Sequence, residues 1–314
     1  MRRRRKFLFW SAFIFIPILF PALVILSFVC YNIYYNPMPR DYTQSEFNNI
    51  ERKPLNEPVT LKILTYNIQD TWVVGQDRPE RMYGIAKKVI EHDPDIVGYQ
   101  EAFISKDREI LIKELTTKSR LKYYKYYRSG FLGSGLLTMS AFPIREGFFH
   151  RYKKAGNWYC LWEGDWWAGK GCALTRIELP GIGFLDFYNT HMQAGYGNEN
   201  YRPVKEAQAR ELAEFINVSY HPEFPTILVG DLNTRPGDIA HENIVEIACL
   251  ERIMSIVSRI DHIYAKKGPD YKFEVLETIE IREGIVPSGK SMRLSDHNGY
   301  MTCVKIMPIK NQTQ

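Results

Sequence analysis

The sequence predicts an α/β sandwich, in which two β-sheets pack face to face and helices flank them. Short apolar or alternating segments typical of strands recur between residues 59 and 306. Apolar residues at helical spacing occur in both halves of this stretch, around residues 82–90 and 204–216. No internal repeat is visible. Strand-rich segments with helices in each half are what two covered sheets require.

The first half of this stretch contains two well-defined strands. Residues 59–67 alternate, with Leu61, Ile63 and Thr65 on one side, and end at Asn67. A short buried strand ends just before Gln100 and Glu101. The expected elements, in order, are a strand at 59–67, a helix at 82–90 that Pro94 closes, a strand at 96–99, a helix at 106–118, and strands near residues 123, 135, 147 and 172.

The second half is centred on residues 224–229, a short run rich in apolar and β-branched residues. It ends abruptly in Gly230 and Asp231, which predicts a buried strand that delivers an acid to the edge of a sheet. The expected elements are a strand at 182–191, a helix at 203–216 with Pro203 in its first turn, the central strand, a helix at 238–249, and strands at 259–265, 273–281 and 299–306.

Polar residues follow several of these strands. Asp231 and Asn233 are two residues apart, so extended backbone would point both side chains to the same side. The pair suits a water, a phosphate oxygen or a hard cation, although Gly-Asp-x-Asn is also a common turn sequence. The strand ends together present Asn67, Glu101, His191, Asp231 with Asn233, and Asp296 with His297.

This set of residues predicts metal-assisted hydrolysis of a phosphate ester. A carboxylate with amide and water ligands is a common way to hold Mg²⁺. Two histidines can supply a general base and a general acid or electrophile. Water would be the nucleophile, because no serine or cysteine lies in an evident nucleophile elbow. Each of these residues alone could also belong to a turn, a helix cap or a loop. The prediction of hydrolysis therefore depends on their joint placement at the ends of strands.

The charge distribution counts against nucleic acid as the substrate. The formal net charge is +5, but residues 2–6 supply five of the 41 basic residues, and the remaining 36 balance the 36 acidic ones. A nucleic-acid binder usually carries a basic footprint. The body of the protein is therefore neutral, and a phosphoester substrate other than nucleic acid is favoured.

The N-terminus predicts a membrane anchor. Residues 7–39 contain no charged residue, and residues 7–31 are long enough to cross a bilayer core of about 30 Å as a helix. A cleavable signal peptide is the alternative, but residues 27–30 do not match its small-x-small site. The basic residues at 1–6 would remain cytoplasmic, which places the catalytic domain on the extracytoplasmic side of a single-pass membrane protein.

Five segments follow from these observations. They are a basic stub at 1–6, a transmembrane segment at 7–31, a linker at 32–59, a catalytic domain at 60–308 and a tail at 309–314.

Six motifs occur in the order seen in the endonuclease/exonuclease/phosphatase superfamily, which the chain resembles over residues 60–307. The motifs are Thr65-Tyr66-Asn67, Gln100-Glu101, Asn189-Thr190-His191, Gly230-Asp231-Leu232-Asn233, Arg259-Ile260-Asp261 and Ser295-Asp296-His297. The resemblance implies the DNase I-like fold, a four-layer α/β sandwich. Within the superfamily the chain is most similar to the neutral sphingomyelinases, through residues 133–144, 164–171 and 190–216.

The resemblance implies a metal site. Glu101 would be the principal Mg²⁺ ligand, with manganese as the alternative ion. Asn67 would contact the metal shell or the phosphate, and Asp296 would support the metal side.

The same resemblance implies the catalytic residues. His297 would activate water as a base, oriented by Asp261. Asp231 and Asn233 would position the nucleophile and the phosphate. His191 would stabilise or protonate oxygen as charge develops.

An aromatic segment indicates the kind of substrate. Trp158, Trp162, Trp166 and Trp167 fall within ten residues, and tryptophan favours the bilayer interface. Ordinary core packing and base stacking are the alternatives. Trp166, Trp167 and Lys170, which lie in a sphingomyelinase-like segment, are the candidate substrate-binding residues.

The sequence therefore predicts a membrane-anchored, Mg²⁺-dependent phosphodiesterase that acts at a membrane surface. Its substrate would be sphingomyelin or a related phospholipid, and the product a phosphorylated headgroup. The alternative is a Mg²⁺-dependent nuclease on the same fold, which would need a basic groove around the strand ends. A non-catalytic membrane-tethered binding module is a third possibility. No protein partner is indicated.

Overall fold

The computed structural model describes residues 17, 19–31, 42, 54–71, 76–160, 162–282 and 293–309. Its contacts divide the chain into two units, Met1–Pro39 and Arg40–Gln314. The first unit contributes a described helical stretch at residues 19–31. All elements named below belong to the second unit.

The predicted single-pass membrane localisation is contradicted. Among the described residues, no helix combines the length and the apolar character needed to cross a membrane. Residues 1–16 and 18 of the predicted stub and anchor, and most of the predicted linker and tail, lie outside the described residues.

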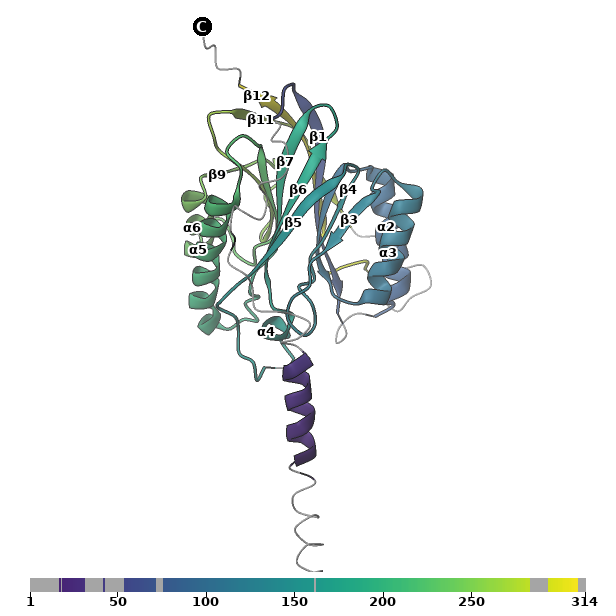
Figure 1. Ribbon diagram of the computed structural model, residues 1–314, viewed down its shortest axis with the longest axis vertical. Coiled ribbons are helices and arrows are strands. Elements are labelled where there is room, and N and C mark those ends of the chain that lie inside the picture. The colour runs from purple at the N-terminus through teal and green to yellow at the C-terminus, as the bar shows by residue number, and fades with distance from the viewer. Residues whose placement is uncertain are drawn as a thin grey trace, which may run out of the picture. The chain divides into compact units, whose positions relative to one another are not determined.

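Two six-stranded sheets form the second unit (Figure 1). The first has the order β11-β12-β1-β2-β4-β3 and the second β5-β6-β7-β8-β10-β9. In each sheet one central pair is parallel, β1 with β2 and β7 with β8. The bounds are β1 Val59–Asp70, β2 Ile96–Ala102, β3 Tyr123–Tyr126, β4 Leu137–Ser140, β5 Ile144–Arg151, β6 Gly171–Leu179, β7 Gly183–His191, β8 Thr226–Asp231, β9 Leu250–Arg252, β10 Asp261–Lys266, β11 Tyr271–Ile281 and β12 Gly299–Pro308.

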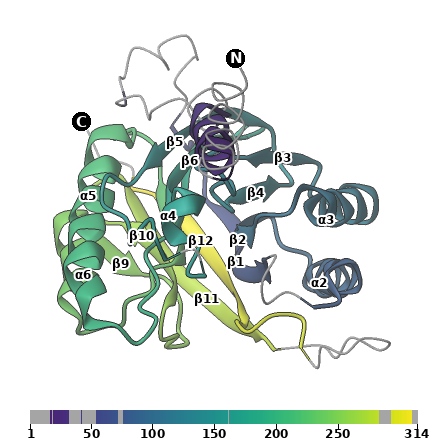
Figure 2. The same cartoon turned by 90° about the horizontal axis from the view of Figure 1, so that it is seen from below.

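Helices cover the outer face of each sheet. Figure 2 shows α2 and α3 on one side of the sheets, and α5 and α6 on the other. The remaining helical segments are short. The bounds are α2 Arg78–His92, α3 Ser105–Lys118, α4 Asp165–Ala168, η2 Glu199–Tyr201, α5 Arg202–Ser219 and α6 Ile239–Ile247. The predicted α/β sandwich, with its order of helices, sheet, sheet and helices, is thus confirmed.

Three large apolar clusters of the described residues hold these layers together. One lies between α2, α3 and the first sheet, and includes Met82 and Val97. A second lies between the sheets, where Ile63 and Val229 are fully buried. The third packs α5 and α6 against the second sheet. Because burying each such side chain contributes about 1.5–3 kcal/mol, the sandwich fixes the strand ends relative to one another.

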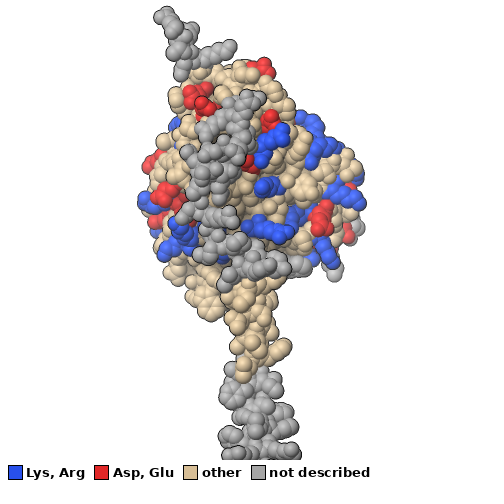
Figure 3. All heavy atoms as spheres, in the orientation of Figure 1, with Lys and Arg blue, Asp and Glu red and all other residues tan. Residues whose placement is uncertain are grey.

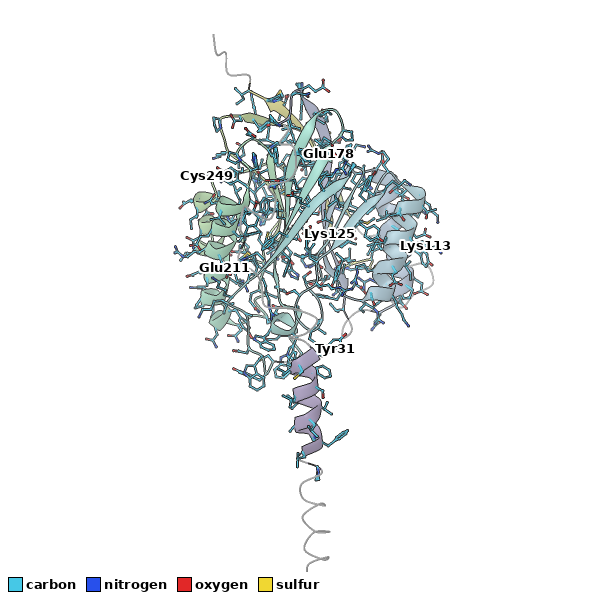
Figure 4. All side chains as sticks on the ribbon, in the orientation of Figure 1. Tyr31, Lys113, Lys125, Glu178, Glu211 and Cys249 are labelled. Carbon is cyan, nitrogen blue, oxygen red and sulfur yellow. The ribbon has the colours of Figure 1, made fainter. Side chains whose placement is uncertain are left out.

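A polar contact also joins α5 to the second sheet. Glu211 of α5, labelled in Figure 4, lies 2.8 Å from Nε2 of His150 on β5. Its carboxylate also accepts hydrogen bonds from the backbone N–H of Lys153. The chain after β5 is therefore held against the helix.

The structure differs from the predicted elements in three places. β1 continues to Asp70, past the predicted end at Asn67, with an irregularity in its pairing between these residues. The short helix α4 lies between Gly164 and Gly169, which both have left-handed backbone. The helix after Asp238 ends at Ile247, and the three-residue strand β9 follows it. Elements this short give too few residues for a period to be recognised.

Candidate functional site

Four predicted site residues, Asn67, Glu101, His191 and Asp231, lie at the carboxyl ends of the two parallel strand pairs, and Asp261 and His297 lie at or just before the starts of β10 and β12. In the first sheet Asn67 is paired with Gln100, next to Glu101. In the second sheet His191 is paired with Asp231. Parallel strands end at the same edge of a sheet. Since the two sheets face each other, four strands deliver polar groups to one place.

Two buried amides join the sheets behind the site. Gln100 Nε2 donates to Asn189 Oδ1 over 2.7 Å, and Asn189 Nδ2 donates to the carbonyl of Tyr99 over 3.0 Å. Both side chains are fully buried. A buried amide is costly unless it is hydrogen-bonded, so this pair holds the two sheets in one register.

Asn67 links the two sheets directly at the site. Its Nδ2 lies 3.0 Å from Glu101 Oε1 and 3.1 Å from Asp231 Oδ2, and donates to both. Glu101 has a φ of 58° and Asn233 a φ of 50°, an uncommon backbone conformation for residues other than glycine. Such conformations persist where the surrounding structure imposes them, often at functional sites.

Asp261 and His297 form a carboxylate-imidazole pair. Asp261 Oδ2 lies 2.9 Å from His297 Nδ1, and His297 Nε2 is 3.8 Å from Asp231 Oδ2. Burial alone would lower the pKa of His297, but the hydrogen bond and charge of Asp261, together with Asp231, raise this pKa to about 10. Burial and the Asp261 charge raise the pKa of Asp231 to about 6.

His191 and Lys170 are buried together. Lys170 Nζ lies 2.9 Å from His191 Nε2 and 2.7 Å from Asp165 Oδ1, and it donates to the carbonyl of Met192. Burial, with the nearby positive charges of Lys170 and His297, holds the pKa of His191 well below its ordinary value. The neutral ring can therefore accept the Lys170 hydrogen bond at Nε2.

Asn233 is held by three contacts. Its backbone N–H donates to Asp231 Oδ1 over 2.9 Å, and its Nδ2 donates to the carbonyl of Met192 over 3.0 Å. Lys205 Nζ donates to the Asn233 carbonyl over 2.9 Å. These contacts fix the loop that follows β8.

The loop before β12 is held by hydrogen bonds to β1 and to α2. Ser295 Oγ donates to the Asn67 carbonyl over 2.7 Å. The buried Arg81 of α2 donates through Nε to the Leu294 carbonyl and through Nη1 to the Gln69 carbonyl. Asp296 itself is exposed. Arg81 thus ties the end of β1 to the loop that carries Asp296 and His297.

The donor set suits a divalent cation. Asp231, Asp261 and His297 each offer a ligand-type atom, and these atoms lie within 4.8 Å of one another. The Glu101 side chain is one-fifth exposed, and it lies beside the Asn67 amide. Carboxylate oxygens with access to water are ligands that Mg²⁺ prefers. The chemistry of these residues therefore fits such an ion.

A groove of about 930 Å³ opens at this site. Asn233, Asp261, Asp296 and His297 are among the residues that line it. Its walls come from the loop after β7, the loop after β8 and the starts of α5 and α6. A bound molecule could thus reach the catalytic candidates from this side.

Most of the aromatic segment lies at the surface. The exposed fractions are 62% for Trp158, 73% for Trp162 and 36% for Trp166. Trp167 is half-buried and donates through Nε1 to the Trp158 carbonyl. Core packing therefore does not account for Trp158 and Trp162.

The structure adds residues that the sequence did not indicate. Asp165 accepts from Lys170, Lys205 supports Asn233, and Arg81 supports the loop before β12. A weak signal existed for Arg81, because it shares a helix face with Ile85 and Val89 at intervals of four residues. Asp165 lies in the sphingomyelinase-like segment 164–171, although no role was predicted for it, and Lys205 carried no comparable signal.

A two-sheet α/β sandwich with acids, amides and histidines gathered at the facing ends of its parallel strands defines a class of metal-assisted hydrolases. The match to the Endonuclease/Exonuclease/phosphatase family model covers residues 64–297. The chain belongs to this family.

Individual relatives are similar over part of their length. A putative neutral sphingomyelinase of Drosophila melanogaster is 31% identical over 281 residues, which cover 81% of this chain and 62% of that protein. An inositol phosphosphingolipids phospholipase C of Schizosaccharomyces pombe is 30% identical over 184 residues, or 58% of this chain and 43% of that protein. The chain thus spans less than two thirds of the length of these relatives.

A solved structure has the same fold. The beta toxin of Staphylococcus aureus, in a mutant form crystallised with bound magnesium ions, has a TM-score of 0.60 and 16% sequence identity. The match covers 78% of this chain and 99% of the toxin.

Proposed function

We propose that this chain is a metal-dependent phosphodiesterase that hydrolyses sphingomyelin or a related phospholipid and releases the phosphorylated headgroup. The observation that carries the proposal is the meeting of Asn67, Glu101, Asp231 and His297 at the facing strand ends. The names of the similar proteins from fly and fission yeast support a phosphosphingolipid substrate. The catalytic domain would span residues 60–308.

The residues divide into a base side and a charge-stabilising side. His297, oriented by the Asp261 carboxylate, would take a proton from the attacking water at Nε2. Asp231, which faces that nitrogen, and the neighbouring Asn233 would hold the water and a phosphate oxygen. Lys170 would place positive charge near the phosphate while His191 stays neutral beside it.

Glu101 would be the principal ligand of a magnesium ion, or of manganese in its place, with Asn67 and the exposed Asp296 on the same side. When bound, the ion would supply positive charge that stabilises the phosphate and, by repulsion, favours the neutral form of His297 that can act as a base. The bound magnesium named for the toxin structure supports this choice of metal.

The exposed tryptophans would bring the enzyme to its substrate. Trp158 and Trp162 expose most of their surface, and an indole ring is stabilised in the headgroup region of a bilayer. Trp166 and Trp167 lie beside each other at the base of this segment, with ring centroids 4.9 Å apart. The segment would contact the lipid surface while the site receives the headgroup.

A nuclease on the same fold is the second candidate, because the groove carries basic residues near the strand ends. Arg202, Lys205, Arg235 and Arg259 line it. Acidic residues line it as well, among them Glu199, Glu206 and Asp238, and Figure 3 shows Lys and Arg interspersed with Asp and Glu on the visible face. The exposed tryptophan segment favours the lipid substrate.

The test is Mg²⁺-dependent hydrolysis by the full chain in detergent micelles. Sphingomyelin, a lysophosphatidylcholine-type lipid and supercoiled DNA are compared, with His297→Ala as the inactive control. Headgroup release that is lost in the variant supports the proposal. DNA nicking with inert lipids would replace it with the nuclease.

A further inference from the structure

We infer that Arg81 is a positioning residue for the proposed hydrolysis, which joins the bulge that orients Asn67 to the loop that carries His297. Arg81 belongs to α2 and does not line the groove. The inference rests on the proposed function, because it assigns Arg81 a part in that reaction. It is carried by the hydrogen bonds of one buried guanidinium group and by the packing of α2 against the loop before β12.

The Arg81 guanidinium group binds two separate segments of the chain. Its Nε donates to the Leu294 carbonyl over 2.6 Å, and its Nη1 donates to the Gln69 carbonyl over 3.1 Å. Its Nη2 donates to the carbonyl of Ile68. The side chain is buried, and a buried charge is costly unless it is hydrogen-bonded. Because all three acceptors belong to the main chain, the group holds the backbone of both segments in place.

The first of these segments is the bulge of β1 at residues 67–70. The pairing of β1 with β2 is irregular within this bulge, and Gln69 has a φ of 48°. The Gln69 backbone N–H donates to Asn67 Oδ1 over 3.1 Å. This bond leaves Asn67 Nδ2 to face the two acids that it contacts at the site. By binding the Gln69 carbonyl, Arg81 therefore fixes the backbone that orients the Asn67 amide.

The second segment is the loop before β12, which begins its approach to the site at Leu294. The next residue, Ser295, donates through Oγ to the Asn67 carbonyl over 2.7 Å. The same Oγ accepts a hydrogen bond from the backbone N–H of His297 over 3.2 Å. Arg81 and Ser295 thus hold the loop against the bulge at two successive residues, just before the imidazole of His297.

The surface of α2 also fits this loop closely at Gly84, three residues after Arg81. A Cβ added at Gly84 would lie 2.4 Å from Leu294 Cδ2. Glycine weakens a helix interior relative to alanine, so helix stability does not account for the residue at this position. The helix therefore holds Leu294 by close packing as well as by the Arg81 hydrogen bond.

These contacts set the separation between the proposed base and the proposed metal side. Asn67 lies beside Glu101 at the end of the first sheet, whereas His297 lies on the loop that Arg81 and Ser295 hold. A displacement of about 1 Å can reduce a rate by about 10²-fold. Arg81 acts on these groups through the main chain, which makes it a positioning residue.

Arg81→Lys tests the inference in the full chain, because it keeps the charge but a single ammonium group cannot reproduce the fork of three donors. Arg176→Lys is the matched control. Arg176 is also buried, and it pairs with Asp186, five residues before His191 on β7. The measurements are kcat, KM and the pH dependence of kcat/KM on sphingomyelin in Mg²⁺, the stability to denaturant, and the affinity for Mn²⁺ alone from the electron paramagnetic resonance of the free ion.

We expect Arg81→Lys to lower kcat at least tenfold, with KM changed less than threefold. A looser loop weakens the bond of Asp261 to His297, which lowers the pKa of His297, so the rising limb of kcat/KM should move to lower pH. Affinity for Mn²⁺ should fall at least threefold, because Asn67 and Glu101 lose their fixed orientation. Arg176→Lys should lose stability but keep the wild-type kcat, pH limb and Mn²⁺ affinity.

A wild-type kcat or an unmoved pH limb in Arg81→Lys would overturn the inference. The same changes in Arg176→Lys would also overturn it, because they would then follow from lost stability alone. If Arg81→Lys does not fold, Gly84→Ala decides, since alanine favours the helix while its Cβ displaces Leu294. A lower kcat with the limb moved to lower pH supports the inference, and wild-type values in Gly84→Ala overturn it.

The Mn²⁺ measurement separates this inference from the proposed function. If the wild type hydrolyses no phospholipid, the proposed function fails. A loss of Mn²⁺ affinity in Arg81→Lys but not in Arg176→Lys would then still support the inference, and equal affinities would overturn it. If the wild type hydrolyses sphingomyelin and Arg81→Lys is equally active, the proposed function stands and the inference fails.

Discussion

The Asp261 carboxylate lies 2.9 Å from Nδ1 of His297, and the opposite ring nitrogen, Nε2, faces the Asp231 carboxylate at 3.8 Å. Asp261 orients the imidazole ring, and Asp231 lies beside the nitrogen at which a water would be activated. Asp261 and Asp231 are also direct neighbours across β10 and β8. The pairing of these two strands thus fixes both ends of the imidazole.

Replacing Asp261 by Asn should slow turnover and shift its pH dependence. Asp261 raises the pKa of His297, so removing its charge lowers that pKa. A base acts only when deprotonated, and the rate therefore rises with pH through this pKa. The rising limb of kcat/KM should move to lower pH, with kcat reduced by about 10² or more. Asp93→Asn, in the loop after α2, is the control, and an unmoved limb would contradict the pairing.

Replacing Glu101 by Gln should remove most metal binding and most activity. A neutral amide is a poorer Mg²⁺ ligand than a carboxylate, and we expect turnover to fall by about 10³. Binding of Mn²⁺, followed by the electron paramagnetic resonance of the free ion, reports the site independently of turnover. Glu109→Gln, exposed on α3, should behave as the wild type. Undiminished Mn²⁺ binding in Glu101→Gln would exclude Glu101 as the principal ligand.

Replacing Trp162 by Ala should weaken binding to lipid vesicles. Its side chain is 73% exposed, and transferring such a ring into the headgroup layer is worth about 1.5 kcal/mol or more, which corresponds to about tenfold in affinity. Vesicle flotation or tryptophan fluorescence measures this change. Tyr83→Ala, which removes a 51% exposed ring on α2, serves as the control. If both variants lost the same affinity for vesicles, the tryptophan segment would not be a specific contact with the lipid surface.

Replacing Gly230 by Ala should destabilise the fold by about 3 kcal/mol or more. Gly230 has a φ of 152°, and an added Cβ would lie 2.1 Å from the Thr190 carbonyl oxygen on the neighbouring strand. That contact involves backbone on both sides, so β7 and β8 would have to separate. Gly268→Ala, where the Cβ meets no atom within 4 Å, should be nearly neutral. Chemical denaturation measures both, and equal midpoints would contradict the predicted clash.

The buried His262 should make stability fall in mild acid. Burial, with His241 nearby, lowers the pKa of His262 to about 4, whereas an unfolded histidine titrates near 6.5. Between these values only the unfolded state binds the proton, so this contribution is complete above pH 6.5 and is lost as pH falls towards 4. At pH 5 the loss is about 2 kcal/mol.

The comparison with His262→Gln isolates this group from the other titrating residues. The stability advantage of the wild type over the variant should shrink by about 2 kcal/mol between pH 7.5 and pH 5. A difference that does not change with pH would show that His262 titrates normally in the folded state.

Local patterns were sufficient for most of the fold. The alternation at residues 59–67 and the helical spacing of Met82 to Ile90 each depend on neighbours in the chain, and β1 and α2 lie where these patterns predict. They failed where an element is too short to repeat its period clearly, as in the four-residue α4 and the three-residue β9. The predicted single-pass membrane localisation was wrong, because none of the described helices has the length and apolar character needed to cross a membrane.

Chain order also indicated which residues belong to the site, because Asn67, Glu101, His191 and Asp231 lie at or just after the ends of predicted strands, and His297 lies just before one. Their contacts could not be predicted. Asn67 touches both Glu101 and Asp231 only because two sheets face each other, and these residues are 34 and 164 positions away along the chain. Lys170 meets His191 through the pairing of β6 with β7, and Arg81 meets Leu294 through the packing of α2 against the loop before β12.

The sequence by itself determined the class of fold, the order of the strands along the chain and the acids, amides and histidines placed at their ends. These properties depend on side-chain period and turn chemistry, which are local. The tertiary structure decided which of these groups touch, how burial shifts the pKa values of His191 and His297, and where four basic residues meet to line one groove. Those properties depend on distance and desolvation between segments remote in sequence, and they arise only when the two sheets pack together.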